Sequence, residues 1–462
     1  MKIRARATGF ALLTIAAVAL AGCATSAGSP ADAPAGDDVA AGTVPALSPD
    51  TEVEIVFESY NIGQAGVWEE TINTLVDEFE QEHPNITVTP QAPSVALSGG
   101  NASTVASVQQ QLLAGNPPDV AQLTFDTLDF TINQLKPPAV EDLFGTAAVE
   151  EHFGGEYPFH ERAKPLADWD GKTYGVPYVF STPLLWVNAT ALEKAGIDPA
   201  TVDLSTWGDV AEVGAQLAEA NGKPPLTVAC ATNVGNWCMQ GIIRSNGGRV
   251  ISEDRSTIEF GEEGAVGAVQ MLRDLYDAGV LENADATAQY EGFARGESLM
   301  QVQTSVMQST FQAAADAGGW ELMAFPLPGF EGKATVPTNS GSALYIFSQD
   351  PAKQAAAWEF ITHMTSPRAY ELITAGIGYV PLRPGITEPG GPLAAWAAET
   401  PTLEPNLEQL DRLEGWQSYP GNSYVQIDDL LWSAIEQSVF FGADVERSLT
   451  EAAERAQGLV AN

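Results

Sequence analysis

The chain has 462 residues, of which 45% are hydrophobic, and its 21 Lys and Arg against 60 Asp and Glu give a formal net charge of −39. This length predicts two or three hydrophobic cores, and the apolar content excludes a wholly disordered protein. A negative field of this size repels phosphate backbones and anionic lipids, which excludes nucleic acid as an expected partner. We interpret the acidity as a solvated surface, with an acidic binding patch for a partner or a cationic ligand as the alternative.

The N-terminus has the pattern of an export signal. Basic residues within the first six positions precede an apolar stretch at 10–21, which is too short to span a bilayer. Leu20-Ala-Gly22 then leads directly to Cys23, an order that resembles a bacterial lipobox. We therefore expect a signal peptide at 1–22 and a lipidated Cys23 that anchors the mature chain to the extracytoplasmic face of the cell membrane. An ordinary signal peptide with a chance cysteine is the alternative.

The segment after Cys23 is poor in large apolar side chains. Residues 24–50 are nearly all Ala, Gly, Ser, Pro, Thr, Asp and Val, and Leu47 is the only larger apolar residue. Such a segment cannot bury enough surface to offset its ordering entropy. We therefore predict that residues 23–51 form the lipidated cysteine and a flexible linker.

Strand and helix patterns alternate along the rest of the chain. The predicted strands are 53–57, 86–88, 120–123 and 343–347, and the predicted helices are 68–82, 103–114, 265–278, 352–365 and 427–440. The order strand, helix, strand, helix, strand at the start of this region predicts a parallel α/β sheet with helices on its faces.

Cys230 and Cys238 are the two cysteines left after Cys23. Disulfides persist outside the cytoplasm, so we predict a bridge between them, with two buried free thiols as the alternative. The four histidines are scattered, and no His or Cys pair has metal-ligand spacing. No metal site and no cofactor are therefore expected.

A series of short motifs runs in order from about residue 53 to the C-terminus. Among them are LVDEFE (75–80), HPNI (83–86), LAGNPPDV (113–120), GKTYGVP (171–177), STPLLWVN (181–188), FARGE (293–297), AWEFI (357–361) and GYVP (378–381). Their wording and order resemble the extracellular substrate-binding proteins of ABC importers, in the family 1, carbohydrate-type group. Within this group, the stretches at 181–183, 340–345, 378–381 and 420–422 are most similar to glycerol-3-phosphate-binding proteins.

The resemblance implies an α/β, two-lobed periplasmic-binding-protein-like fold of type II. A ligand cleft would lie between the lobes, at the carboxyl ends of strands, and hinge closure would bury the ligand. The expected lobes are 52–180 with 298–342 (lobe 1) and 181–297 with 343–462 (lobe 2), joined by hinge crossings near 178–184, 293–301 and 340–347. The closed form would dock on the transmembrane subunits of an ABC permease, and the protein is expected to be a monomer.

The same resemblance implies a ligand site that combines aromatic rings with small polar groups. The positions carried over are Asn101, Phe125, Ser181, Thr182, Trp237, Gly341, Tyr379 and Tyr419, with Asn236 beside Trp237 in the loop that the disulfide would brace. Aromatic faces would cover the CH surface of a sugar, while hydroxyls and backbone N–H groups would pair with its hydroxyls. Core packing is the alternative role for Phe125 and Tyr379, and packing beside the disulfide is the alternative for Trp237.

Two positions depart from the glycerol-3-phosphate-binding group. Phe125 stands where that group has a glutamate, and Tyr419 stands where it has the arginine that meets the phosphate. Burying a phosphate without a cation or a helix N-terminus is costly, and Arg383 is the candidate to replace the missing arginine. We therefore expect a mono- or oligosaccharide ligand, with a glycerophosphodiester or another polyol phosphate as the alternative.

Two further classes of protein are weighed against this one. An exported glycan-active enzyme would need two carboxylates placed across a cleft, and the 60 acidic residues cannot select such a pair. None of the motifs G-x-S-x-G, G-x-x-x-x-G-K-[ST] and H-E-x-x-H occurs. We therefore predict a binding protein and no enzyme; a surface adhesion module is the remaining alternative.

Overall fold

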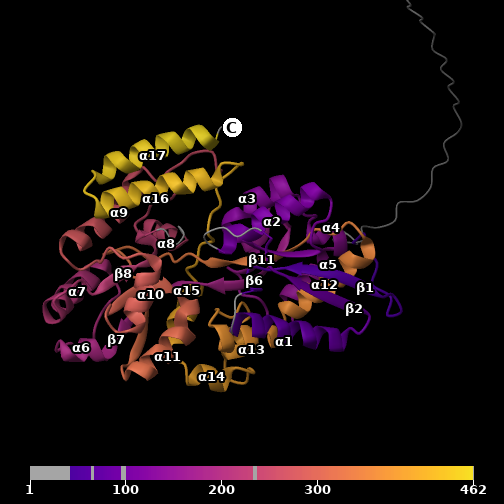
Figure 1. Ribbon diagram of the computed structural model, residues 1–462, viewed down its shortest axis with the longest axis horizontal. Helices are drawn as coiled ribbons and strands as arrows, with labels where there is room; N and C mark the ends of the chain where they lie inside the picture. The colour runs from indigo at the N-terminus through magenta and orange to yellow at the C-terminus, as the bar shows by residue number, and fades with distance from the viewer. Residues whose placement is uncertain (1–41, 64–66, 95–99, 233–236, 461–462) are drawn as a thin grey trace, which may run out of the picture. The chain divides into compact units, whose positions relative to one another are not determined.

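Residues 42–63, 67–94, 100–232 and 237–460 are described by the computed structural model of the protein (Figure 1). Within these ranges no helix has both the length and the apolar character that crossing a membrane requires. Cys23, the signal peptide and residues 24–41 of the expected linker lie outside the described residues. Residues 42–51 of that linker are described, and the prediction of flexibility is wrong for this part, because the backbone N–H of Val44 donates to the carbonyl of Leu143 at 2.9 Å and Val44 and Leu47 pack against a hydrophobic cluster.

The described chain alternates between strands and helices. The strands are β1 (Val53–Glu58), β2 (Ile86–Gln91), β3 (Val120–Thr124), β4 (Asp168–Trp169), β5 (Lys172–Thr173), β6 (Gly175–Ser181), β7 (Pro183–Asn188), β8 (Leu226–Val228), β9 (Met300–Thr304), β10 (Leu322–Pro326) and β11 (Ser340–Ile346). The helices are α1 (Val67–Glu82), α2 (Gly100–Ala114), α3 (Leu128–Phe130), α4 (Val140–Phe144), α5 (Thr146–Phe153), α6 (Ala189–Lys194), α7 (Trp207–Asn221), α8 (Trp237–Ser245), α9 (Glu263–Asp277), α10 (Ala286–Ala294), α11 (Gln308–Gly318), α12 (Pro351–Met364), α13 (Pro367–Leu372), α14 (Ala394–Ala398), α15 (Glu404–Leu410), α16 (Tyr424–Phe440) and α17 (Val445–Val460). Each strand and helix expected from periodicity is confirmed, with ends that differ by a few residues.

The first sheet has five strands in the order β2-β1-β3-β11-β6. β1 is parallel to both β2 and β3, which confirms the expected parallel arrangement for the opening strands. β11 runs antiparallel to β3 and β6, so the complete sheet is mixed. We call this sheet and the helices packed on it lobe 1.

The second sheet has four strands in the order β10-β7-β9-β8, and we call it and its helices lobe 2. Only β8 and β9 pair in parallel, while β7 runs antiparallel to both β9 and β10. In Figure 1, α16 and α17 lie side by side over this half of the described chain.

Each sheet is buried on both faces, which explains its nearly continuous apolar strands. On β11, Leu344 belongs to one hydrophobic cluster of lobe 1 and its neighbour Tyr345 to the other. On β7, Leu185 belongs to the large cluster of lobe 2, whereas Trp186 packs with Phe311 on the opposite face. This alternation follows from the two-residue period of a strand, and it fixes the register of both sheets.

The points at which the chain crosses between the lobes differ in part from the predicted ones. The chain first crosses at Thr182, between β6 and β7, as predicted, but it crosses again within 327–339, between β10 and β11, and within 411–423, between α15 and α16. The predicted crossing at 293–301 is wrong, because β9 pairs between β7 and β8 inside lobe 2.

The expected lobe boundaries change accordingly. Residues 298–342 were assigned to lobe 1, but they contain β9 and β10 of the lobe 2 sheet. The assignment of everything after residue 343 to lobe 2 is also wrong, because α12 packs against β1. Within this packing, the rings of Phe57 on β1 and Phe360 on α12 are in contact, with ring centroids 5.1 Å apart.

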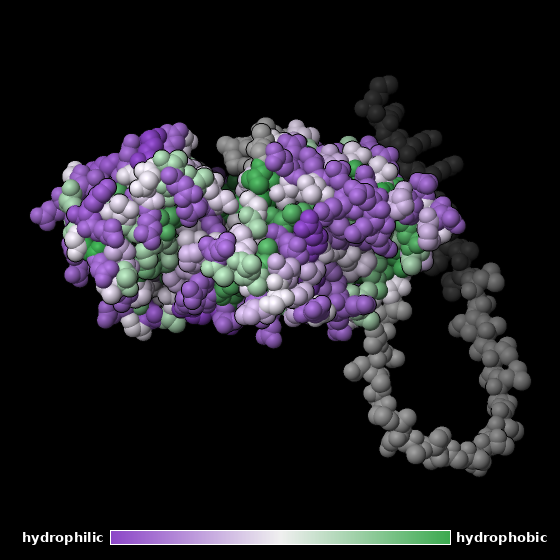
Figure 2. All heavy atoms as spheres, turned by 90° about the horizontal axis from the view of Figure 1, so that it is seen from below, coloured by the Kyte–Doolittle hydropathy of each residue, from purple (hydrophilic) through white to green (hydrophobic). Residues whose placement is uncertain are grey.

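The surface agrees with the acidic composition. Figure 2 shows hydrophilic residues over most of the face that it displays. Among the described residues, the large exposed apolar side chains are Val67, Leu113, Val425 and Phe441. They belong to α1, α2 and the two ends of α16, so the exposed apolar residues are dispersed.

Candidate functional site

Thr182 links the two sheets where β6 passes into β7. Its hydroxyl donates to Asn406 Oδ1 at 2.6 Å and accepts from Gln409 Nε2 at 3.3 Å, both on α15. Its carbonyl accepts from the backbone N–H of Ser305 at 3.0 Å, which follows β9. The side chain predicted as a ligand contact therefore already has protein partners on both sides, and it fastens the first crossing to α15.

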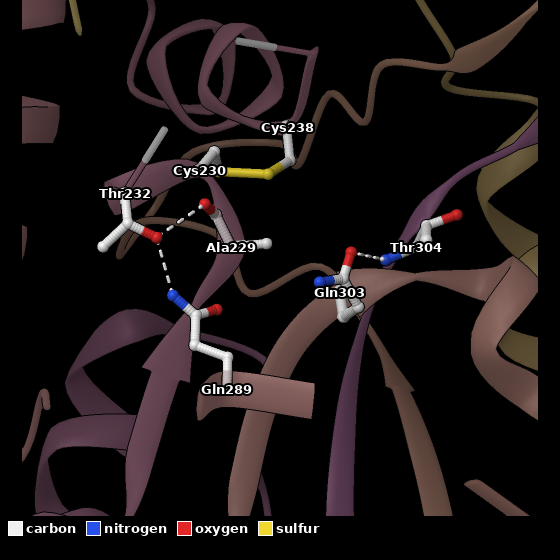
Figure 3. The surroundings of a disulfide bond; sticks show 7 residues. All are labelled: Ala229, Cys230, Thr232, Cys238, Gln289, Gln303 and Thr304. Carbon is white, nitrogen blue, oxygen red and sulfur yellow. Dashed lines mark hydrogen bonds between the residues drawn. A yellow bond between two sulfur atoms is a disulfide. The ribbon is translucent and has the colours of Figure 1, made fainter. Parts of the chain in front are cut away.

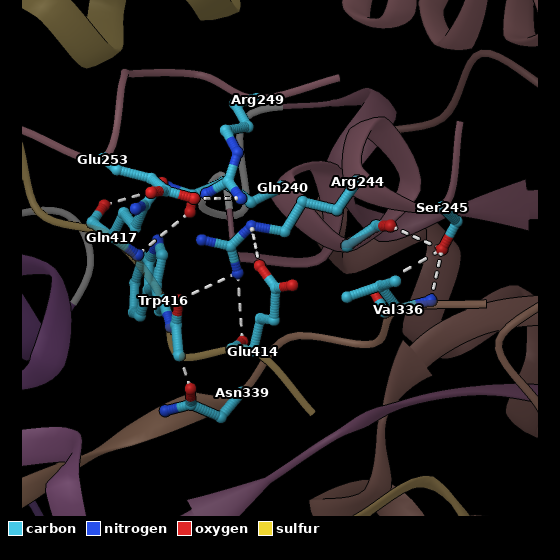
Figure 4. Close-up of polar contacts among 12 residues, drawn as sticks. Gln240, Arg244, Ser245, Arg249, Glu253, Val336, Asn339, Glu414, Trp416 and Gln417 are labelled. Carbon is cyan, nitrogen blue, oxygen red and sulfur yellow. Dashed lines mark hydrogen bonds and ion pairs between the residues drawn. The ribbon is translucent and has the colours of Figure 1, made fainter. Parts of the chain in front are cut away.

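The third crossing is clamped by α8 of lobe 2 (Figure 4). The guanidinium of Arg244 donates to the carbonyls of Glu414 at 3.1 Å and Gly415 at 2.9 Å. Gln240 exchanges two hydrogen bonds of 3.0 Å with the backbone of Gln417. Burial lowers the pKa of Arg244 to about 10, which leaves it charged at neutral pH. The crossing is thus held by a rigid part of lobe 2.

The second crossing meets the third at Asn339. Its Oδ1 accepts from the backbone N–H of Trp416 at 2.9 Å, while its buried Nδ2 has no hydrogen-bond partner within the described chain. A cavity of about 380 Å³ lies at this junction, between Leu128 and Leu166 of lobe 1 and Arg244 of lobe 2.

A polar aromatic group lies at the carboxyl ends of β1 and β3 in lobe 1. Tyr60 donates to Ser342 Oγ at 3.1 Å, and Gln122 Nε2 donates to the same oxygen at 2.8 Å. Tyr379 contacts Tyr60 and meets Trp68 edge to face, with ring centroids 5.3 Å apart. Burial raises the pKa of Tyr60 to about 12, so its hydroxyl stays protonated and available as a donor.

A second group combines two carboxylates with tyrosines from both lobes. Asp126 follows β3, and burial raises its pKa to about 6. Asp428 lies on α16, where burial, then the charge of Asp126, raise its pKa well above the usual range. Burial and the charge of Asp428 raise the pKa of Tyr419, and burial and the charge of Asp126 raise that of Tyr424. Asp126 of lobe 1 therefore acts electrostatically on Asp428 and Tyr424 of α16, and Asp428 acts on Tyr419.

Several buried polar atoms near these strand ends have no hydrogen-bond partner within the described chain. They are Asp126 Oδ1, Gln303 Nε2, Ser305 Oγ, Asn339 Nδ2, Tyr345 OH and Tyr419 OH. Asp126 follows β3, Gln303 and Ser305 lie at the end of β9, Asn339 precedes β11 and Tyr419 belongs to the third crossing. Tyr345 is the exception, because it lies near the far end of β11, opposite Ala121 at the start of β3. An unsatisfied buried polar atom costs about 1–3 kcal/mol, so a group of them marks a place that a polar ligand could satisfy.

The disulfide lies beside this region in lobe 2 (Figure 3). Cys230 and Cys238 are bonded, with Cα atoms 5.8 Å apart. Thr232 accepts from Gln289 Nε2 at 2.7 Å, which ties the loop to α10. Asn236 lies outside the described residues, so its predicted ligand contact has no structural description.

The aromatic residues carried over by resemblance are all buried. Phe125 is 1% exposed in a lobe 1 cluster, and Tyr379 is 6% exposed in the other lobe 1 cluster. Trp237 and Tyr419, 5% and 3% exposed, both join the large cluster of lobe 2. Tyr379 has polar neighbours in Tyr60 and Asn61, and the charge of Asp428 acts on Tyr419, whereas Phe125 and Trp237 are described by their packing.

The small residues carried over have backbone roles. Ser181 pairs with Ser340 at the end of the β6–β11 ladder. Gly341 has a φ of +123°, and a Cβ there would lie 2.0 Å from the carbonyl oxygen of Val179. Glycine is therefore required for the approach of β11 to β6. Asn101 belongs to α2, and its side chain lies outside the described residues.

Arg383 is not available to replace the missing phosphate-binding arginine. Its guanidinium donates to the carbonyls of Thr365, Gly154, Tyr157 and His152 and lies 4.2 Å from the ring centroid of Phe159. All of these neighbours belong to lobe 1, so Arg383 has a structural role there.

Sequence reasoning missed Asp126, Asp428, Tyr60 and Gln303. Asp126 comes three residues after the predicted strand 120–123, and that position is the one signal that could have marked it. Asp428 is one acid among many on a helix, and only the effect of the charge of Asp126 on it distinguishes it. Within the described part of the chain, no group of three or more His, Cys, Asp or Glu could hold a metal ion.

Residues 74–405, well over half of the chain, match the family described as bacterial extracellular solute-binding protein. An uncharacterized ABC transporter extracellular-binding protein of Pyrococcus horikoshii is 28% identical over 175 residues, which is 37% of this chain and only 36% of the relative. The sn-glycerol-3-phosphate-binding periplasmic protein UgpB of Pectobacterium atrosepticum is 23% identical over 67% of this chain and 70% of the relative.

Solved structures show the same fold at lower identity. UgpB from Mycobacterium tuberculosis, in complex with glycerophosphocholine, has a TM-score of 0.75 at 22% identity and covers 88% of this chain and 98% of its own. The GacH receptor of Streptomyces glaucescens, solved unliganded and with acarbose, has a TM-score of 0.73 at 16% identity over 89% of this chain and 100% of its own. These likenesses confirm the expected two-lobed fold.

Proposed function

This chain belongs to the bacterial extracellular solute-binding proteins, and from that premise we propose that it binds a carbohydrate between its lobes and delivers it to the permease of an ABC importer. One observation carries the proposal. Strand ends of both lobes carry buried polar atoms that have no hydrogen-bond partner within the described chain, namely Asp126 Oδ1 after β3 and Gln303 Nε2 and Ser305 Oγ at the end of β9, and aromatic residues such as Tyr60 and Tyr379 lie at the ends of the lobe 1 strands. Aromatic faces with hydroxyl and amide groups between them suit a sugar.

A glycerophosphodiester is the second candidate, because UgpB relatives and the structure with glycerophosphocholine resemble this chain. The electrostatics of the site count against it. Arg383 is occupied within lobe 1, and Tyr419 lies beside the carboxylate of Asp428. A phosphate near that carboxylate would be repelled unless a cation intervened.

A thermal-shift screen tests the proposal. It should contain mono-, di- and trisaccharides, glycerol-3-phosphate and glycerophosphocholine. A ligand at 100 times its Kd adds about 2.7 kcal/mol to the free energy of unfolding. Stabilisation by a saccharide without product formation supports capture and argues against an exported enzyme. Stabilisation by glycerol-3-phosphate alone, or steady turnover of a saccharide, contradicts the proposal.

We further propose that the protein acts as a monomer. Lipid on Cys23, which follows Leu20-Ala-Gly22, would hold it at the outer face of the cell membrane. We expect Cys23→Ser to lose the lipid and to leave the membrane fraction, because the lipid would be attached through the thiol of Cys23. Cell fractionation, with an antibody that detects the protein in the membrane and soluble fractions, measures this. A variant that stays in the membrane as firmly as the wild type contradicts lipidation.

A further inference from the structure

A row of polar side chains crosses the interior of lobe 2. Gln301 on β9 lies directly opposite Trp186 of β7 on one side and opposite Thr227 of β8 on the other. Residues that pair across neighbouring strands point to the same face of a sheet, with side chains that start about 5 Å apart. Trp186 packs against Phe311 of α11, so the three side chains point toward the helices that cover this face.

The polar atoms of this row are buried and unpaired. Trp186 and Gln301 are fully buried, and Thr227 is 1% exposed. The indole N–H of Trp186, both polar atoms of the Gln301 amide and the hydroxyl of Thr227 have no hydrogen-bond partner within the described chain. Unpaired polar atoms in a dry interior are costly and rare in native proteins. Their concentration in one row indicates that a further molecule completes their hydrogen bonds.

α10 separates the row from solvent. It packs on β9, and its Phe293 joins Trp186 in one hydrophobic cluster. Gln289 lies four residues before Phe293, and hence on the same face of α10. It is 1% exposed, and its Oε1 has no partner within the described chain, while its Nε2 donates to Thr232 (Figure 3). The row is thus enclosed by packed elements, which admits only a very small molecule.

The row extends along β9 to the candidate ligand site. Side chains two residues apart on a strand share a face, so Gln303 follows Gln301 on this side of the sheet. Gln303 Oε1 accepts from the backbone N–H of Thr304 at 2.8 Å, which leaves Nε2 as the unpaired donor (Figure 3). The backbone N–H of Ser305 then donates to the carbonyl of Thr182 at the first crossing. Gln303 therefore lies between the buried row and the point where the chain passes between the lobes.

The chemistry of the row selects its occupant. Indole and amide N–H groups donate, amide oxygens accept, and a hydroxyl does either. None of these groups is charged, so nothing in the row compensates the burial of an ion. A sugar ring is too large for a space enclosed in this way. Water both donates and accepts, and a buried water molecule makes about three hydrogen bonds to polar groups that lack other partners.

We propose that lobe 2 contains an internal water site, in which ordered water molecules bridge Trp186 Nε1, the amide of Gln301 and Thr227 Oγ1. Gln301 is its central residue, because it contributes a donor and an acceptor between the other two. The site supports the end of β9 from the interior of the lobe. It does not depend on the proposed carbohydrate function, so either proposal can fail without the other.

A high-resolution crystal structure of the ligand-free mature protein tests the site directly. We expect ordered water within about 3.2 Å of the Gln301 amide and of Thr227 Oγ1 or Trp186 Nε1. Direct hydrogen bonds among these three side chains, with no water between them, would overturn the inference. An ion or a sugar group bound to Gln301 in any crystal form would overturn it as well.

Variants distinguish a hydrated row from a dry one. Thr227→Val and Gln301→Met nearly keep the side-chain volume and remove the polar atoms. In a hydrated row each change removes hydrogen bonds to water, and we expect the unfolding equilibrium constant to rise at least about fivefold. In a dry row the same changes would remove unpaired polar atoms, so unchanged or increased stability would overturn the inference.

Thr87→Val is the matched control for these variants. Thr87 is an exposed residue of β2 in lobe 1, and its hydroxyl reaches solvent in the folded and the unfolded protein. We expect its unfolding constant to change less than about twofold. An effect of Thr87→Val as large as that of Thr227→Val would assign both to the loss of a hydroxyl from a strand and would overturn the inference.

Hydrogen–deuterium exchange tests the support that the site gives to β9. In Gln301→Met, exchange of the segment 300–305 should accelerate at least about fivefold more than exchange of β1 in lobe 1. Equal acceleration in the two segments would mean general destabilisation, and unchanged exchange at 300–305 would mean that the strand end holds without water. Either result would overturn the role proposed for the water site.

Discussion

The guanidinium of Arg255 lies 4.5 Å from the ring centroid of Trp169, although the two residues belong to different lobes. Arg255 occupies a turn of lobe 2 with a φ of +61°, and Trp169 ends β4 against the lobe 1 core. The same guanidinium lies 3.4 Å from Asp129 Oδ2 of lobe 1 and donates to the carbonyl and hydroxyl of Ser418 at 2.6 and 2.7 Å. One side chain therefore connects both lobes and the third crossing.

We expect Arg255→Ala to weaken ligand binding and to lower the free energy of unfolding by about 1–3 kcal/mol, because stacking and charge-assisted hydrogen bonds across the lobes are lost together. Calorimetry and denaturant titration measure the two effects. Arg295→Ala is the control, since the ion pairs of Arg295 are exposed to water and should contribute little to stability. Unchanged affinity in Arg255→Ala would show that this contact does not hold the lobes in the binding conformation.

Asp126 gives a pH dependence of known sign in the ligand-free protein. Burial raises its pKa from the usual value near 4 to about 6, so the folded state binds a proton that the unfolded state has released. Its contribution to stability is therefore favourable below about pH 4 and is lost as the pH rises to about 6.

Asp126→Asn should remove this loss and stabilise the ligand-free protein by about 1–3 kcal/mol at pH 8. Thermal melting across this pH range measures it. Exposed Asp429→Asn should leave the profile nearly unchanged, and identical profiles for all three proteins would mean that Asp126 is well solvated in the folded state.

Local sequence patterns predicted the elements but not how they are shared between the lobes. The helical spacing of Ile72, Leu75 and Phe79 predicts α1 whichever part of the protein the helix packs against. The placement of β9 depends on its partners β7 and β8, and pairing between distant segments leaves no local signal. For the same reason the effect of the charge of Asp126 in lobe 1 on Asp428 in lobe 2 could not be predicted, because it depends on the folded chain.

Unfolding of the unreduced mature protein should reveal no free thiol other than any at Cys23, because Cys230 and Cys238 are bonded. Titration with a thiol reagent measures this. Replacing both cysteines by serine should lower the free energy of unfolding by about 2–3 kcal/mol, the entropy expected for a short closed loop. Two titratable thiols in the unreduced wild type would contradict the bridge.

Trp237 tests whether one aromatic side chain both supports lobe 2 and binds the ligand. Because Trp237 is 5% exposed within the lobe 2 core, Trp237→Ala should cost about 3–5 kcal/mol of stability. Trp237→Phe keeps most of the packing, and we expect it to weaken carbohydrate binding by about 1–2 kcal/mol through the smaller ring.

Trp207→Phe is the matched control, since Trp207 is buried in the same cluster on α7, away from the predicted site residues. Calorimetric titration of the two phenylalanine variants with the carbohydrate measures their affinities and distinguishes packing from ligand contact. Equal affinities would assign Trp237 to packing alone, and a loss confined to Trp237→Phe would place its ring at the ligand.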